Sequence, residues 1–290
     1  MPRADVSRGI ELEYDVTGES GAPTLVLVMG FGAQMVFWDV RFCAQLAARG
    51  FRVVRFDNRD VGLSTKLPGM PDFSRAMLGD RSAATYTIED MADDLSGLIA
   101  ALGVASAHIV GASMGGFIVQ ETAIRHPEQV KSLTSIMSST GNRKVGQPRP
   151  DALSTLLTPP PADRDGAIER AVVLWRTIGS PGFPFDEASI RRRAGLVWDR
   201  DHDATGIARQ AAALFTQRDR TADLGHVQIP ALVIHGADDP LITLSGGEAT
   251  AKAIPGARLL VVPGMGHDLP EPAWPTLIDA IVDNAHRAGA

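Results

Sequence analysis

The stretch "SAHIVGASMGGFIVQETA", residues 106–123, places one serine between an apolar run and an apolar, helix-like segment. At its centre, Gly111 and Gly115 flank Ser113 in a Gly-x-Ser-x-Gly spacing. The spacing alone is weak, because chance produces it in about one of six sequences of this length and glycine content. The context is more specific: a strand runs up to Gly111, a tight turn carries Ser113, and a helix follows. A serine at a helix N-terminus is a candidate nucleophile, because the N–H groups there can stabilise an oxyanion.

The rest of the chain alternates buried apolar runs with helix-like segments. A hairpin is predicted between residues 5 and 17, with a turn at Arg8-Gly9. Further strands are predicted at residues 24–29, 51–57, 108–111, 130–137, 231–236 and 257–264. Helices are predicted at residues 38–49, 88–102, 115–126 and 273–285. This alternation predicts an α/β fold with a mostly parallel central sheet and helices on both faces.

The strand runs stop between residues 141 and 223, where prolines and aromatic residues gather among helical segments. We interpret this stretch as a helical cap, residues 141–223, inserted into a core domain of residues 1–140 and 224–290. Within the cap, the run Arg191-Arg192-Arg193 is expected to lie on a solvated helix face, because no glycine-rich phosphate loop accompanies it.

Composition excludes several classes of function. The 290 residues are 44% apolar and 21% charged with a net charge of −6, which fits one large globular unit. Clustered basic residues and long apolar spans are lacking, so neither nucleic acid nor a membrane is an expected partner. Metal-ligand spacings and a dinucleotide fingerprint are also lacking, so we expect no metal and no cofactor. The single cysteine, Cys43, suits a cytoplasmic protein.

A serine hydroxyl needs a base to act as a nucleophile at neutral pH, and the base needs an acid to orient it. His267 is the best-placed histidine, because it lies in a glycine-rich loop after the last predicted strand, where ligand sites of open α/β sheets gather. His235 ends a buried strand and is interpreted as structural. Asp238 and Asp239 follow the penultimate strand, and at most one of these neighbours is expected to face the histidine. The order serine, aspartate, histidine is typical of α/β-hydrolases.

With these motifs in place, the whole chain resembles the α/β-hydrolase-fold serine esterases. The resemblance implies that Asp239, which precedes Pro240, is the acid, with Asp238 as the second choice. Three stretches are similar to the aclacinomycin methylesterase-like branch of the fold: Met29-Gly30, Asp-x-Arg-Asp at residues 57–60, and Pro-Gly-Met-Gly-His at residues 263–267. The stretch at residues 57–65 is expected to pin loops beside the site.

An oxyanion hole requires two N–H donors aimed at the developing charge. One is expected to be the backbone N–H of Met114, which follows the nucleophile. By resemblance, the second is the backbone N–H of Phe31, in the loop after the first parallel strand. Gly30, Met35 and Met265 are expected to contribute to an adaptable substrate site.

The expected activity is hydrolysis of a small to medium apolar carboxylic ester through an acyl-enzyme, by Ser113, His267 and Asp239. The same three side chains also suit lactone opening, carbon–carbon bond hydrolysis or perhydrolysis, which differ in the pocket rather than in the reactive groups. A different class also stays open, a ligand-binding receptor with negligible turnover. The expected partner is a small-molecule ester, and a homodimer is left open.

Overall fold

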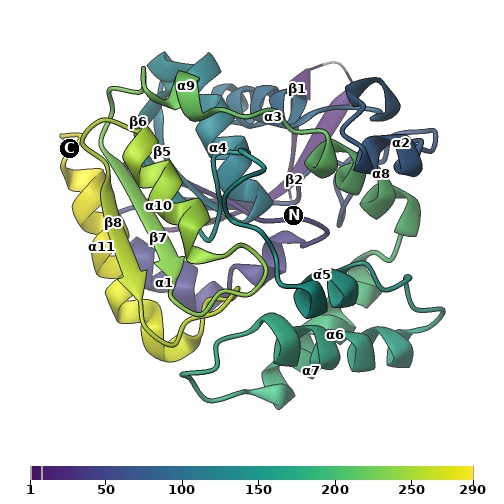
Figure 1. Cartoon of the computed structure of the whole chain (residues 1–290). Helices are drawn as coiled ribbons and strands as arrows, with labels where there is room; N and C mark the ends of the chain where they lie inside the picture. The colour runs from purple at the N-terminus through teal and green to yellow at the C-terminus, as the bar shows by residue number, and fades with distance from the viewer. Residues whose placement is uncertain (1, 8, 290) are drawn as a thin grey trace.

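The computed structural model describes residues 2–7 and 9–289, and eight strands in this part of the chain form one sheet (Figure 1). The sheet order is β1-β2-β4-β3-β5-β6-β7-β8; β1 and β2 are antiparallel to their neighbours and the rest are parallel. The strands are β1 (Arg3–Ser7), β2 (Ile10–Thr17), β3 (Thr24–Val28), β4 (Arg52–Phe56), β5 (Ala107–Ala112), β6 (Val130–Ile136), β7 (Ala231–Gly236) and β8 (Arg258–Val262). The predicted hairpin is present, although Arg8 of its turn lies outside the described residues.

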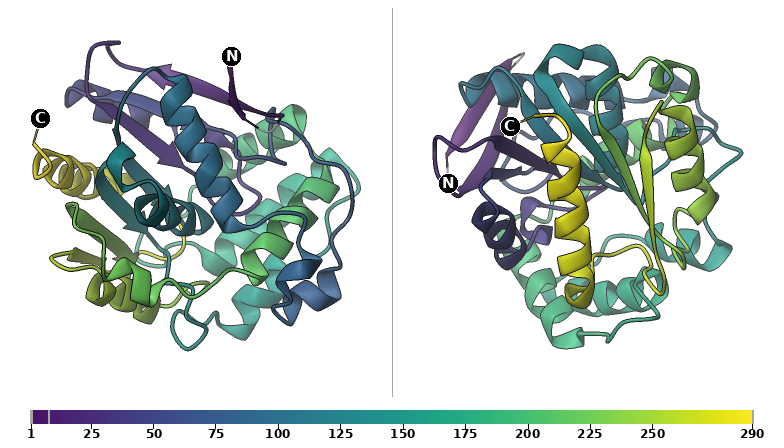
Figure 2. Two further views of the ribbon diagram at one scale, coloured as in Figure 1. Left: turned by 90° about the horizontal axis from the view of Figure 1, so that it is seen from above. Right: turned by 90° about the vertical axis from the view of Figure 1, so that its left-hand side faces the viewer.

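Helices cover both faces of the sheet (Figure 2). The helices are α1 (Val40–Ala48), α2 (Phe73–Met77), α3 (Ile88–Ala101), α4 (Met114–Arg125), α5 (Pro150–Leu156), α6 (Arg164–Ile178), α7 (Glu187–Arg200), α8 (Ala204–Phe215), α9 (Thr221–Leu224), α10 (Leu244–Ala253) and α11 (Trp274–His286), with short 3-10 turns at Met35–Phe37, Arg81–Ala83, Pro127–Gln129 and Glu271–Ala273. Helices α3, α4 and α10 pack against one face, whereas α1 and α11 pack against the other. Within residues 2–7 and 9–289, every helix is too short or too polar to span a lipid bilayer.

The apolar character of the central strands explains why they lie in the middle of the molecule. Every residue of β3 and β5 is buried, because parallel strands covered by helices have no solvated face. Alternate residues of these strands enter two separate cores: Val26 and Ile109 pack with α3 and α4, whereas Leu27 and Val110 pack with α1 and α11. The predicted α/β class, with a mostly parallel central sheet and helices on both faces, is confirmed.

Helices α5 to α8 interrupt the alternation of strands and helices between β6 and β7, and we call residues 150–215 the helical insertion. Figure 1 shows α5, α6 and α7 stacked on one another beyond one end of the sheet. This is the end at which the parallel strands finish, because the residues that follow β3, β5 and β6 line a cavity together with residues of the insertion. The insertion therefore lies where α/β sheets place their ligand sites.

His108, near the start of β5, is buried in the sheet rather than on the surface. Its Nδ1 lies 2.9 Å from Ser132 Oγ on β6, and its ring meets Phe51 edge-on with centroids 5.7 Å apart. Burial lowers the pKa of His108 to about 4. In the unfolded chain the pKa of a histidine is about 6.5, so protons favour unfolding between these two pH values.

We expect the His108→Gln variant to lose part of the acid sensitivity of the fold. Wild type should lose up to about 3 kcal/mol of unfolding free energy between pH 6.5 and pH 4 through this residue, and the variant should not. Urea unfolding at several pH values measures the difference. His226→Gln is the control, because His226 is exposed in the folded protein. Parallel pH profiles for wild type and His108→Gln would contradict the assignment.

Candidate active site

Ser113 occupies a sharp turn between β5 and α4. Its φ of 56° and ψ of −122° are strained for a residue with a side chain. The turn is possible because glycines allow the backbone to approach itself: a Cβ on Gly111 would lie 2.1 Å from Gly115 O, and one on Gly115 would lie 2.2 Å from Val28 O. The glycine spacing is therefore a steric requirement of the turn. It places the Ser113 hydroxyl at the N-terminus of α4, above the end of the sheet.

Three side chains far apart in the sequence converge at this turn. Ser113 Oγ lies 2.9 Å from His267 Nε2, and His267 Nδ1 lies 2.7 Å from Asp239 Oδ2. The ionised carboxylate can only accept hydrogen bonds, so the imidazole proton is on Nδ1. Nε2 is then left as the acceptor that faces the serine hydroxyl. The arrangement can remove a proton from Ser113 and pass it to another group.

The Asp239 carboxylate is buried, and each of its two oxygens accepts hydrogen bonds from different partners. Oδ1 accepts the backbone N–H groups of Leu241 and Ile242 at 2.8 and 2.9 Å, and Oδ2 is left for His267. Asp238 points elsewhere, because its Oδ2 accepts the backbone N–H of Gly264 at 2.9 Å. Of the two neighbouring acids, only Asp239 contacts the histidine.

His235 lies beside this pair without joining the contact with Ser113. Its Nε2 donates to Ile242 O at 2.7 Å, and burial lowers the pKa of His235, so the ring stays neutral. It supports the loop that holds Asp239. Among the described residues, no group of three His, Cys, Asp or Glu side chains is arranged to hold a metal ion.

The loop after β3 passes directly over the serine. A Cβ on Gly30 would lie 2.9 Å from Ser113 Cβ, so Gly30 is a point of close approach that admits no side chain. Phe31 follows it and, with Gly30, lines the same cavity as Ser113. The backbone N–H of Met114 is the first of α4, where N–H groups lack partners within the helix. These two backbone positions border the serine from both sides.

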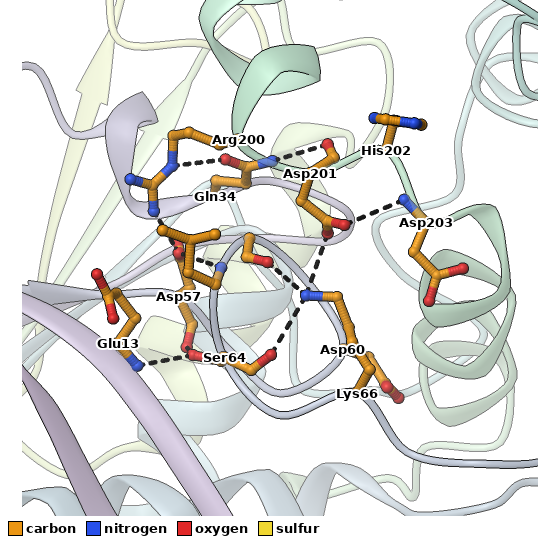
Figure 3. Close-up of polar contacts among 12 residues, drawn as sticks. Glu13, Gln34, Asp57, Asp60, Ser64, Lys66, Arg200, Asp201, His202 and Asp203 are labelled. Atoms are coloured by element: carbon orange, nitrogen blue, oxygen red, sulfur yellow. Dashed lines mark hydrogen bonds and ion pairs between the residues drawn. The ribbon is translucent and has the colours of Figure 1, made fainter. Parts of the chain in front are cut away.

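A buried carboxylate and a side-chain amide hold that loop in place, and Figure 3 shows the carboxylate, Asp57. Asp57 Oδ1 accepts the Met35 N–H at 2.7 Å, and its Oδ2 accepts from Arg200 of α7. Gln210 of α8 accepts the Gly32 N–H at 2.9 Å. The helical insertion therefore supports the loop after β3 directly. Arg200 and Gln210 belong to no sequence motif, so neither was predicted to take part in the site.

The insertion also holds the loop that carries His267. The His267 N–H donates to Ile178 O at 2.7 Å, at the end of α6. Ser180 donates its hydroxyl to Asp268 and accepts the Gly266 N–H at 2.9 Å. Burial raises the pKa of Asp268, although the Ser180 hydrogen bond opposes the shift. The position of His267 thus depends on the insertion as well as on the sheet.

A cavity of about 690 Å³ opens beside Ser113 and His267. Core residues such as Gly30 and Phe31 form one wall, and aromatic residues of the insertion, including Trp175 and Trp198, form another. Met35 and Met265 were expected in the substrate site, but neither lines this cavity, and both side chains are fully buried. The two methionines are close to the motifs in sequence, but this closeness did not indicate the direction in which their side chains point. The methionines that line the cavity are Met29, Met77 and Met137.

We expect Ser113→Gly to be more stable than Ser113→Ala by about 1 kcal/mol, because glycine relieves the strain of the positive φ and alanine retains it. Both variants lack the hydroxyl, so the pair isolates the backbone effect. Chemical unfolding in urea measures it. If alanine proves equal to or better than glycine, Ser113 is not strained.

Comparison with known proteins agrees with this geometry. The family model described as alpha/beta hydrolase fold matches residues 23–272. A rhodomycin D methylesterase, DauP, from a Streptomyces species is 28% identical over 99% of both chains. A 2-hydroxy-6-oxononadienedioate/2-hydroxy-6-oxononatrienedioate hydrolase from Paraburkholderia xenovorans is 27% identical over 89% of this chain and 84% of its own.

Among solved structures, an enol-lactonase from Burkholderia xenovorans is similar, with a TM-score of 0.75 and 25% identity over 98% of this chain and 99% of that chain. The expected resemblance to a methylesterase branch is confirmed by the match to a named methylesterase along nearly the full length. The family model alone covers far more than half of the sequence. The chain therefore belongs to the alpha/beta hydrolase fold family.

Proposed function

We propose that this protein is a serine carboxylesterase in which Ser113 is the nucleophile, His267 the general base and Asp239 the orienting acid. The observation that carries the proposal is the continuous line of contacts from Ser113 Oγ through His267 to Asp239, at 2.9 and 2.7 Å. Similarity to proteins named methylesterases supports ester hydrolysis as the reaction.

In the proposed reaction, His267 Nε2 takes the Ser113 proton as Oγ attacks the ester carbonyl carbon. The tetrahedral intermediate collapses when His267 gives that proton to the leaving alcohol, which departs and leaves an acyl-serine. Water then attacks the acyl-serine, with His267 again as the base, and releases the acid. Asp239 stabilises the imidazolium that forms in both halves of the cycle.

The backbone N–H groups of Phe31 and Met114 are the proposed donors to the oxyanion. Support for the first is the close approach of Gly30 to Ser113, and support for the second is its place at the start of α4. Both donors belong to the backbone, so their positions depend on how the loop around Phe31 is held. Gln210 accepts the Gly32 N–H of this loop, and Asp57 accepts the Met35 N–H.

We further propose that residues 141–223 form a cap over a core of residues 1–140 and 224–290, and that the cap selects the substrate. The cavity wall is mostly apolar and aromatic, and its volume suits a small to medium ester. Lactone opening and carbon–carbon bond hydrolysis remain second candidates, because an enol-lactonase and an oxononadienedioate hydrolase are among the similar proteins. The same side chains would perform the first steps in each case.

Ser113→Ala and His267→Ala should each lower kcat for 4-nitrophenyl butyrate by about 10⁵-fold or more. The double variant should lose no more than either single variant, because the two residues act as one unit. Steady-state release of 4-nitrophenolate measures this. A wild type that retains the ester without turning it over would instead identify a receptor of the same fold.

The neighbouring acids provide a matched pair. Asp239→Asn should lower kcat by about 10⁴-fold, because asparagine can impose the wrong imidazole tautomer. Asp238→Asn should stay within a few-fold of wild type, since Asp238 contacts Gly264 rather than the histidine. The same chromogenic assay compares the two variants. Equal losses would mean that Asp239 has no special part in the reaction.

A further inference from the structure

Arg193 differs from Arg191 and Arg192, the two arginines that precede it on α7. It lies on α7 and lines the cavity. The run Arg191-Arg192-Arg193 was predicted to lie on a solvated helix face, and for Arg193 that prediction is wrong. Arg192 is exposed, and Arg191 pairs with Glu169 and Glu187 on the surface. Arg193 instead faces two aromatic rings, with its guanidinium carbon 4.9 Å from the centre of Phe37 and 5.6 Å from that of Trp175.

Within residues 2–7 and 9–289, the Arg193 guanidinium has no hydrogen-bond or ion-pair partner. The acids that attract it from a distance are Asp39, Asp186 and Asp268, and each has another partner. Arg41 pairs with the Asp39 carboxylate. The Asp186 carboxylate accepts the Ser189 N–H, and the Asp268 carboxylate accepts the Ser180 hydroxyl. Burial without a close counter-charge lowers the pKa of Arg193, although arginine remains charged at neutral pH.

Arg200, on the same helix, is an arginine whose charge is balanced by an ion pair with a carboxylate. It lies seven residues, or about two helical turns, after Arg193 and so shares its face. Arg200 contacts Asp57 and donates to Gln34 Oε1 at 2.9 Å (Figure 3). Arg200 therefore connects α7 to the core. The N–H donors of Arg193, in contrast, have no partner in the described residues and remain available to a ligand.

The charges around the cavity agree with this difference. Arg143 and Arg170 also line it and bind only backbone carbonyl groups. Among the described residues that line the cavity, Asp201 is the only one with a carboxylate, and its Oδ2 lies 3.2 Å from Lys66 Nζ. The cavity is thus cationic although the whole chain has a net charge of −6. Low-dielectric aromatic walls strengthen the field of such charges.

We propose that Arg193 is a substrate-binding residue that receives a carboxylate, so that the preferred substrates are esters or lactones with a second, anionic end. This rests on the proposed function, because Ser113 must receive the ester carbonyl in the same cavity. A guanidinium presents paired N–H donors that match a carboxylate. Phe37 and Trp175, whose ring centres lie 6.0 Å apart, both pack against the guanidinium, while the apolar wall accommodates the carbon chain between the two ends.

The test compares two esters that differ in charge: 4-nitrophenyl hydrogen adipate, which carries a free carboxylate, and 4-nitrophenyl hexanoate, which does not. Arg193→Gln should lower kcat/KM for the adipate ester by about 10- to 100-fold, through KM, and leave the hexanoate ester within about three-fold. Arg193→Lys should retain part of the preference. Arg192→Gln is the matched control and should change neither ester, because Arg192 is exposed outside the cavity.

Equal losses on both esters, or no loss on either, would overturn the proposal and leave the proposed function intact. If Arg193→Gln does not fold, wild type decides: its preference for the adipate ester should shrink as NaCl rises from about 0.02 to about 0.5 M, and a salt-independent ratio would overturn the proposal.

Binding without turnover separates the two proposals. Isothermal titration should show that 4-phenylbutyrate binds Ser113→Ala at least about ten-fold more tightly than the neutral 4-phenylbutyramide does. This difference should disappear in Ser113→Ala/Arg193→Gln. If wild type hydrolyses no ester yet the difference is present, the esterase proposal fails and the anion site stands. If the two ligands bind equally, the anion site fails.

Discussion

The close approach of backbone segments around Ser113 is the constraint on which the rest of the site depends. The strand, the turn and α4 meet so tightly that Gly111 and Gly115 leave no space for a side chain, and Ser113 adopts a positive φ as a result. This strained turn lifts the hydroxyl above the sheet and aims α4 at it. The buried sheet and α4 together hold a conformation that an isolated peptide would not retain.

Buried carboxylates hold the surrounding loops in the same way, by accepting hydrogen bonds from more than one segment of the chain. Asp239 gives one oxygen to two backbone N–H groups and the other to His267, and Asp57 divides its oxygens between the Met35 N–H and Arg200. Asp60 forms a two-point pair with Arg209 of α8 at 2.8 and 2.9 Å. Each group fixes a loop and connects it to another element, so the core and the insertion share one framework of polar contacts.

Some elements escaped prediction for identifiable reasons. Helix α10 was not predicted, because its sequence "LSGGEATAKA" has a weak apolar stripe. Its two glycines allow it to approach the sheet instead: a Cβ on Gly247 would lie 2.5 Å from His235 Nδ1. In the insertion, Arg193 was assigned to the surface with its neighbours, because a run of like charges gives no sign of which member turns inward.

Local sequence was sufficient to predict the fold class, the turn at Ser113 and the few candidate partners of that serine, because apolar periodicity and glycine spacing follow directly from backbone geometry. It favoured Asp239 over Asp238 only through a family resemblance, and it did not place Met35 and Met265 correctly or identify Arg193, Arg200 and Gln210. Those outcomes depend on the direction of each side chain after distant loops have packed together. Tertiary structure decides them, because one-residue differences in a loop reverse that direction while leaving the local sequence pattern unchanged.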